Sequence, residues 1–274
     1  MPVDPLEQLE QNWVALPDKP EETPAGTLAA LRRIADGDDV LLADLVARRI
    51  AGVPLAHLTG RQTFLGIEML AGPEALIPRV ETEILARGAL NLVRGIVKAQ
   101  GSARVLDVCC GSGNIALALA WHEPECEVAG ADISEAAVEL ARRNATMLGL
   151  EGRVAFLTSD LFASVIGAFE LITCNPPYIS SGRVDKMHRE ISAFEPRLAF
   201  DGGPFGIRIL TRLIREAPAF LKPGGWLAFE TGAGQGDPMV KMMRTSPAFV
   251  EVEPLTDQNG ETRAVLGRTA PASV

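Results

Sequence analysis

The segment Asn175-Pro176-Pro177-Tyr178, called the acceptor loop below, holds the residue types needed to fix a planar nitrogen. An amide or exocyclic amine is a poor nucleophile because its lone pair is delocalised, so a catalyst must hold the NH2 group and direct that lone pair at an electrophile. The Asn175 side-chain oxygen and the Pro176 carbonyl are acceptors for such a group. The prolines fix φ at about −65° and stiffen the loop, and the Tyr178 ring can pack on a flat substrate. We interpret the segment as a catalytic and substrate-binding loop; the competing interpretation is a turn that simply ends a strand.

The acceptor loop follows an apolar, strand-like run at residues 169–174, and strands and helices alternate around it. Alternation of this kind predicts an α/β fold, with a parallel sheet and helices on both faces. The Asn259-Gly260 pair is a hairpin signal between the last two strands. We expect strands at 104–109, 127–132, 154–157, 169–174, 226–230, 249–255 and 262–267, and helices at 81–99, 114–120, 135–148 and 207–220.

The first 60 residues follow a different pattern. Asp38 can cap a helix whose apolar positions run from Val40 to Ile50, and Gly52 can end it. Residues 63–69 have enough β-branched and aromatic side chains for a short strand or hairpin. The sequence therefore predicts an N-terminal helical domain at 1–60, a linker with a β-hairpin at 61–78 and a larger domain at 79–274.

A glycine-containing run follows the first expected strand of the larger domain. Gly111 and Gly113 have no side chains, which lets a ligand approach the backbone at a helix start. The run Cys109-Cys110-Gly111-Ser112-Gly113 lacks the G-x-G-x-x-G spacing of a dinucleotide site. A single nucleoside ligand without a phosphate fits this run better.

The next two strand ends carry carboxylates, at the edge of an open α/β sheet where ligands bind. Asp132 lies 19 residues after Gly113 (132 minus 113), a position typical of a carboxylate that accepts hydrogen bonds from ribose hydroxyls. Asp160 ends the third strand and can accept from an adenine amino group, with Leu161 or Phe162 covering the ring. These residues predict a nucleoside pocket.

The composition, with 47% hydrophobic and 22% charged residues among 274, is that of a globular protein with a full core. A formal charge of −9 opposes binding to phosphate backbones and favours a protein or small-molecule substrate over nucleic acid. No apolar run reaches the roughly 18 residues of a membrane helix, and Met1-Pro2-Val3-Asp4 is not typical of a secretion signal. We expect a cytoplasmic protein with no membrane partner. Cysteines and histidines lack metal-ligand spacing, so no metal site is expected.

Three segments narrow the interpretation further: 76–83 (Leu-Ile-Pro-Arg-Val-Glu-Thr-Glu), 175–179 (Asn-Pro-Pro-Tyr-Ile) and 195–203 (Glu-Pro-Arg-Leu-Ala-Phe-Asp-Gly-Gly). With the strand ends above, they resemble the S-adenosylmethionine-dependent methyltransferases. The resemblance sharpens to the HemK/PrmC-type family, which methylates a glutamine side-chain amide at N5 in peptide release factors. The first segment is similar to the family's I-P-R-P-E-T-E and the third to its E-P-x-x-A-L-x-G-G. The resemblance covers about residues 50–268.

The resemblance implies a Rossmann-like class I methyltransferase fold, in which a seven-stranded sheet with its last strand antiparallel follows a helical domain that recognises the protein partner. It implies S-adenosyl-L-methionine as cofactor and a release factor glutamine as methyl acceptor. Cofactor contacts carry over to residues 109–113, Asp132, Leu161 and Asn175. Asp160 is expected to contact the cofactor as well. Substrate contacts carry over to the acceptor loop, with Arg79 and Glu195 of the flanking segments beside it.

The sequence departs from the family pattern at several positions. Val80 stands where family members usually have proline, and Cys109-Cys110 replaces the common Gly-Thr. The region before residue 60 matches only weakly. Two alternatives therefore stay open: an N-methyltransferase for a small metabolite or another protein, and a protein that keeps the fold and binds cofactor or partner without turnover. Adenine N6 methylation, by analogy with enzymes that share the loop, is opposed by the net acidity.

Overall fold

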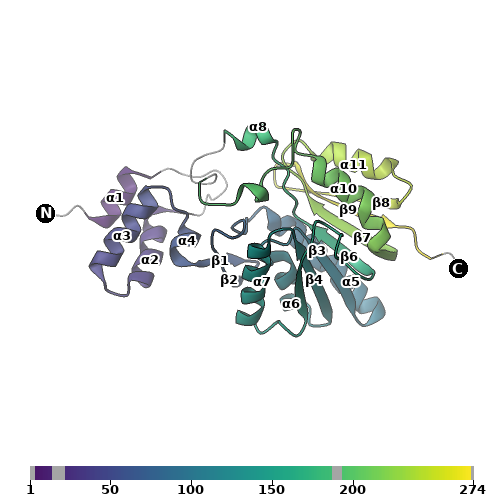
Figure 1. Cartoon of the computed structure of the whole chain (residues 1–274), viewed down its shortest axis with the longest axis horizontal. Coiled ribbons are helices and arrows are strands. Elements are labelled where there is room, and N and C mark those ends of the chain that lie inside the picture. Colours follow the sequence, from purple (N-terminus) through teal and green to yellow (C-terminus); the bar gives the residue numbers. More distant parts are fainter. Residues whose placement is uncertain (1–3, 14–21, 187–192, 273–274) are drawn as a thin grey trace.

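The computed structural model describes residues 4–13, 22–186 and 193–272. The Asp38 carboxylate caps the third helix by accepting from the Val40 and Leu41 amides, both at 2.9 Å. The apolar faces of the N-terminal helices form a cluster of their own, separate from the clusters around the sheet. The helices, at the left in Figure 1, are α1 (Pro5–Gln11), α2 (Pro24–Ala35), α3 (Asp39–Ile50) and α4 (Leu55–Thr59).

A two-stranded antiparallel hairpin follows these helices, formed by β1 (Arg61–Phe64) and β2 (Ile67–Leu70). The expected hairpin is therefore confirmed. Met69 is fully buried in a core cluster of the large sheet. The Leu70 amide donates to Oδ1 of Asn144 at 2.6 Å, so the hairpin packs on the larger part of the molecule.

Seven strands form one mixed sheet in the order β5-β4-β3-β6-β7-β9-β8. β9 is antiparallel to both of its neighbours, and all other adjacent pairs are parallel. The seven-stranded sheet with an antiparallel last strand, which the family resemblance implied, is confirmed. The strands are β3 (Ala103–Val108), β4 (Cys126–Asp132), β5 (Val154–Thr158), β6 (Phe169–Cys174), β7 (Leu221–Glu230), β8 (Phe249–Thr256) and β9 (Thr262–Thr269).

Helices cover both faces of this sheet (Figure 1). One face packs against α5 (Thr82–Gln100), α6 (Asn114–His122) and α7 (Glu135–Met147). The other packs against α10 (Arg208–Glu216) and α11 (Gly236–Thr245). In the described parts of the chain, no helix combines the length and the apolar character needed to cross a membrane.

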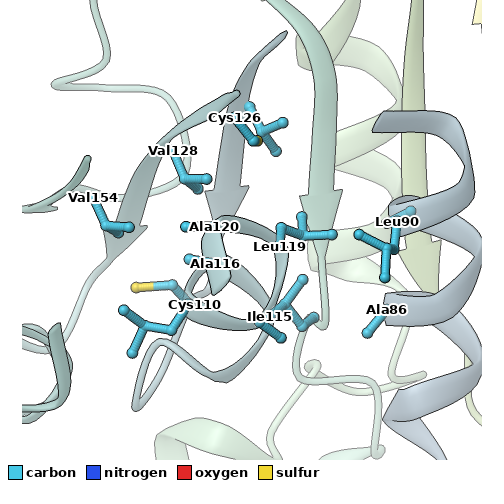
Figure 2. Packing of buried hydrophobic residues seen from close by; sticks show 14 of the residues in the cluster. Ala86, Leu90, Cys110, Ile115, Ala116, Leu119, Ala120, Cys126, Val128 and Val154 are labelled. Atoms are coloured by element: carbon cyan, nitrogen blue, oxygen red, sulfur yellow. The ribbon is translucent and has the colours of Figure 1, made fainter. Parts of the chain in front are cut away.

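The two hydrophobic layers follow from strand geometry, because consecutive strand residues point to opposite faces. Val105 of β3 belongs to the layer under α5, α6 and α7, and its neighbour Leu106 belongs to the opposite layer. Figure 2 shows Leu90 of α5, Leu119 of α6 and Val128 of β4 gathered in the first layer. This core fixes the strand ends that carry the expected site residues.

Two expected boundaries are wrong. β7 begins at Leu221 rather than Trp226. Phe169 of β6 pairs with Leu221 and Leu171 pairs with Trp226, so the glycine-rich residues between Leu221 and Trp226 form a bulge within the strand. The helix α10 stops at Glu216, and the 3-10 helix η2 (Ala217–Phe220) continues from it because Pro218 has no N–H and cannot extend an α-helix. The helix α11 was not predicted.

In its described parts, the chain between β6 and β7 returns to the acceptor loop that follows β6. It includes α8 (Ser181–Val184) and the 3-10 helix η1 (Arg197–Ala199). The Ile179 amide donates to the Phe200 carbonyl at 2.9 Å, and the Gly202 amide donates to the Ile179 carbonyl at 2.8 Å. These bonds hold the 195–203 segment next to the acceptor loop.

Candidate active site

A cavity of about 360 Å³ lies at the carboxyl ends of β3, β4, β5 and β6. The chain crosses here from one side of β3 to the other, and such reversals of strand order are where open α/β sheets bind ligands. Five predicted residues do not line the cavity: Ser112, Gly113, Pro176, Tyr178 and Glu195. The predicted residues that do line it are Arg79, Cys109, Cys110, Gly111, Asp132, Asp160, Leu161, Asn175 and Pro177.

The turn between β3 and α6 uses left-handed backbone at its glycines, with φ of 54° at Gly111 and 83° at Gly113. A Cβ at Gly113 would lie 2.9 Å from Cζ of Phe156 and 3.1 Å from the Ala141 Cβ. Gly113 is therefore needed for packing under the turn. Ser112 is also buried, so the cavity meets the first part of the predicted cofactor run, and the last two residues lie behind it.

Cys109 has a φ of 56°, a left-handed conformation that favours glycine. A non-glycine residue held there costs about 1 kcal/mol. The replacement of the family's glycine by Cys109 is thus accommodated with local strain at the cavity wall.

Asp132 is tied to the backbone on both sides of the cavity floor. Its Oδ2 accepts from the Gly111 amide and its Oδ1 from the Ser134 amide, each at 2.9 Å. Burial raises the pKa of this carboxyl, and the backbone hydrogen bonds oppose that shift. An ionised carboxylate has about four acceptor positions, so acceptor capacity remains for hydroxyl groups of a ligand.

Asp160 is half exposed, and both of its oxygens lie near Nη1 of Arg212, at 2.9 and 3.2 Å. Leu161 is buried and lines the cavity, as expected for a residue that covers a ring. Phe162 instead stacks on Phe220, with ring centroids 4.7 Å apart. The role of Asp160 toward an amino group remains a prediction, because its carboxylate is shared with Arg212.

The acceptor loop begins where β6 ends, so Asn175 faces the cavity from the middle of the sheet. Its Nδ2 donates to Oγ1 of Thr82 at 3.1 Å, which leaves the amide oxygen as an acceptor for a ligand. Pro177 lines the cavity and Pro176 is buried. The Tyr178 ring is turned away from this cavity, and its role as a stacking surface for substrate remains a prediction.

Arg79 and Glu195 join the two family-like segments on either side of the acceptor loop. Oε1 of Glu195 accepts from Nη2 of Arg79 at 2.6 Å, and Oε2 accepts from the Ile77 amide at 2.8 Å. The Glu195 side chain is 1% exposed. Its carboxylate therefore does not face the cavity and instead holds the side chain of Arg79, which lines it.

The sequence reasoning missed two buried polar residues that support the loop. Thr82 begins α5 and contacts Asn175. Glu230 ends β7, where its Oε1 accepts from the Tyr178 hydroxyl at 2.9 Å. A signal for each was present: Thr82 lies in the family-like segment 76–83, and Glu230 is a carboxylate at the ligand-binding edge of the sheet.

Two cysteines next to the site are poorly suited to act as nucleophiles. Cys110 and Cys174 are buried, and burial raises the pKa of both thiols. Protonated thiols of this kind are poor nucleophiles. Within the residues that the structure describes, no group of three or more His, Cys, Asp or Glu side chains is arranged to hold a metal ion.

Residues 83–205 match the family model of the methyltransferase small domain. A release factor glutamine methyltransferase of Bradyrhizobium diazoefficiens is 37% identical over 242 residues, covering 88% of this chain and 81% of that protein. One from Geobacter sulfurreducens is 38% identical over 225 residues, covering 82% of this chain and 76% of that protein.

Among solved structures, a methyltransferase of Pyrococcus furiosus superposes with a TM-score of 0.54 at 15% sequence identity, covering 90% of this chain and 98% of that one. At this identity the likeness shows the fold alone. The fold is that of a Rossmann-like class I methyltransferase, in agreement with the strand order.

Proposed function

The chain belongs to the family of release factor glutamine methyltransferases, and on that premise we propose that it transfers a methyl group from S-adenosylmethionine to the side-chain amide nitrogen of a glutamine in a peptide chain release factor. The observation that carries this proposal is the position of Asn175. Its side chain lines the same cavity as Asp132 and Gly111, so an amide nitrogen held by Asn175 would lie beside a bound nucleoside.

The residues around the cavity fit S-adenosylmethionine. The volume of about 360 Å³ falls within the roughly 300–1,000 Å³ of small-molecule sites. Asp132 has acceptor positions left for ribose hydroxyls, and Leu161 supplies an apolar surface for a ring. We propose that Cys109, Cys110 and Gly111 complete this side, with Asp160 and Arg212 near the outer end.

When bound, S-adenosylmethionine supplies a methyl group already activated by its sulfonium centre, so the chain need not provide a strong base. The task of the acceptor loop is alignment. Oδ1 of Asn175 accepts from the substrate NH2 group, which orients the nitrogen lone pair and stabilises the positive charge that develops there. The same role for the Pro176 carbonyl stays a prediction, because Pro176 is buried and does not line the cavity. Removing orientational freedom in this way contributes several kcal/mol. Overall, one methyl group replaces one proton of the amide nitrogen, so the products would be the N-methylated amide, S-adenosylhomocysteine and a proton released to solvent.

A second cavity, of about 590 Å³, supports a protein substrate. It is lined by α2, α4, the hairpin and the start of α5, and it shares Pro78 and Arg79 with the first cavity. We propose that residues 1–60 form a domain that binds the release factor, joined through the linker 61–78 to the methyltransferase domain 79–274. The proposal puts the protein in the cytoplasm, where translation takes place.

The proposed function is tested by incubating the protein with unmethylated release factor and S-adenosylmethionine that carries an isotopically labelled methyl group. Peptide mass spectrometry is expected to find the label on one glutamine amide. A release factor with that glutamine replaced by asparagine is the control and should stay unlabelled. Label that appears only on extracted metabolites or nucleic acid would contradict the proposal.

A further inference from the structure

The turn of the β1–β2 hairpin has a conformation that one of its two residues does not favour. Leu65 and Gly66 join the strands with φ of 47° and 78°. A two-residue hairpin turn with positive φ at both positions usually has asparagine or aspartate before the glycine. Holding a leucine there costs about 1 kcal/mol, and such strain persists only where surrounding contacts fix it.

Side chains of α5 and α6 hold both polar groups of the Leu65 backbone. Oε1 of Glu83 accepts from the Leu65 amide at 3.0 Å, and Nε2 of His122 lies 3.0 Å from the Leu65 carbonyl oxygen. Because a carbonyl can only accept, the His122 nitrogen carries the hydrogen of this bond. Glu83 lies in the first turn of α5 and His122 is the last residue of α6, so two helices fix one turn residue.

The other end of the hairpin is fixed by a buried amide of α7. Oδ1 of Asn144 accepts from the Leu70 amide at 2.6 Å, and Nδ2 donates to the Leu70 carbonyl at 3.2 Å. The same Nδ2 donates to the Ser112 carbonyl at 3.0 Å, in the turn after β3. Asn144 is 0% exposed, so water does not compete for these bonds. The hairpin is therefore bound at its turn and at its end to helices that cover the sheet.

The hairpin also forms part of the second cavity. All four residues of β1 line this cavity, together with residues of α2, α4 and the segment 78–80. Pro78 and Arg79 line both cavities, so the two cavities are neighbours. His122 is not among the described residues that line either one. A shift of the hairpin would therefore change where the second cavity lies relative to Asn175.

We propose that His122 is a positioning residue for the protein substrate, which acts through Leu65 to hold the hairpin wall of the second cavity at a fixed distance from Asn175. Glu83 holds the same turn residue at its amide. The inference rests on the proposed function and deepens it, because a release factor segment bound in the second cavity then presents its glutamine at Asn175. A free amide has no such segment and gains nothing from the fixed spacing, so the arrangement favours a protein substrate.

The experiment compares His122→Ala with the unaltered protein in steady-state methylation of release factor. The alanine removes the donor to the Leu65 carbonyl and changes no residue that lines a cavity. We expect KM for release factor to rise about threefold to tenfold, the factor that corresponds to one lost hydrogen bond, with kcat and the Kd for S-adenosylmethionine within about twofold. Glu125→Ala, which changes an exposed carboxylate in the turn after α6, is the matched control and should alter none of the three.

Replacements that keep the two hydrogen bonds distinguish positioning from a general structural role. His122→Gln retains a side-chain NH2 group that can donate to the Leu65 carbonyl, and Glu83→Gln retains an oxygen that can accept from the Leu65 amide. Both variants should keep KM for release factor within about twofold of the parent value, whereas Glu83→Ala should raise it as His122→Ala does. An unchanged KM in folded His122→Ala, or a fall in kcat as large as the rise in KM, would overturn the proposal.

A readout without turnover separates this inference from the proposed function. The backbone amide of Leu65 should exchange slowly with solvent deuterium in the unaltered protein and at least about threefold faster in His122→Ala. If release factor is not methylated at all, the proposed function fails, and this exchange measurement alone decides whether His122 holds the hairpin. Equal exchange of the Leu65 amide in His122→Ala and the parent would overturn the inference.

Discussion

The two walls of the main cavity are built in different ways. The cofactor wall consists of neighbouring parallel strand ends, with Asp132 bonded to the backbone amides of Gly111 and Ser134. The acceptor wall depends on side chains from distant parts of the chain, such as Thr82 and Glu230, which lie 93 and 55 residues from Asn175. Regular structure positions the first wall, and buried polar contacts position the second.

This difference leads to a separation of effects. Changes in the cofactor wall should alter the affinity for S-adenosylmethionine, because its acceptor positions face a ligand that is bound before chemistry occurs. Changes in the acceptor wall should alter the rate of methyl transfer, because they affect the direction of one nitrogen lone pair. The predictions below test whether the two walls separate in this way.

The largest effect is expected for Asn175→Ala. Without the side-chain amide, turnover on release factor should fall at least about a hundredfold, the scale of losing a positioned polar group. The Kd for S-adenosylmethionine, measured by calorimetry, should stay within about tenfold. The control is Asn259→Ala, which changes an exposed turn residue far along the chain. Turnover close to the parent value would remove Asn175 from the catalytic role.

A smaller effect on stability is expected for Glu195→Gln. Glutamine can still accept from the Ile77 amide, but the part-buried Arg79 loses its carboxylate partner. The free energy of unfolding in urea should fall by about 2 kcal/mol. The exposed pair of Asp185 and Arg197, at 2.7 Å, gives the comparison: Asp185→Asn should change the free energy of unfolding by less than about 1 kcal/mol. Equal losses in both variants would show that burial of the pair is unimportant.

The fold was largely predictable because its signals are local. The strand 169–174 is a mostly apolar run, and the cap at Asp38 and the Asn259-Gly260 turn each depend on a few adjacent residues. The start of β7 was misjudged since Gly224 and Gly225 indicate a turn, whereas pairing with β6 overrides that local signal. Pro218 ended α10 earlier than its apolar spacing indicated.

The candidate site was predictable only in part. Asp132 and Gly111 could be found because strand ends meet at one edge of a parallel sheet. Thr82 and Glu230 stand at positions that the sequence marks, but their contacts with Asn175 and Tyr178 could not be assigned, because no local pattern tells which of many carboxylates and hydroxyls becomes buried against the acceptor loop. The position of Glu195 on Arg79 depends on the segment that folds back between β6 and β7, whose path no periodicity encodes.

In the cofactor wall, Asp132→Asn should weaken S-adenosylmethionine binding about tenfold, since an amide cannot accept from both backbone amides and the ligand. Because the pKa of Asp132 is raised, the carboxyl gains a proton at a higher pH than an ordinary aspartate as the solution is acidified. Affinity of the unaltered protein should therefore fall as pH is lowered through that raised pKa. Calorimetry across pH checks this, and a variant with the same pH dependence as the parent would contradict it.

The smallest effect is expected for Cys109→Gly, which relieves left-handed strain but adds flexibility to the unfolded chain. The free energy of unfolding should change by less than about 1 kcal/mol. Cys126→Gly, at a fully buried position of β4 without positive φ, should lose about 2 kcal/mol. If Cys109→Gly lost as much as Cys126→Gly, the conformation at Cys109 would carry no strain.

The division between the walls is tested most directly by the rate of methyl transfer to release factor at increasing S-adenosylmethionine concentration, measured side by side in Asp132→Asn and Asn175→Ala. Saturating cofactor should bring Asp132→Asn to within about threefold of the parent rate, because this variant is expected to lose cofactor affinity. The free energy that corresponds to a threefold difference, RT ln 3, is only a small part of the free energy of a lost hydrogen bond. Asn175→Ala should stay at least about a hundredfold slower at every concentration. Recovery of Asn175→Ala at high cofactor, or failure of Asp132→Asn to recover, would contradict the account.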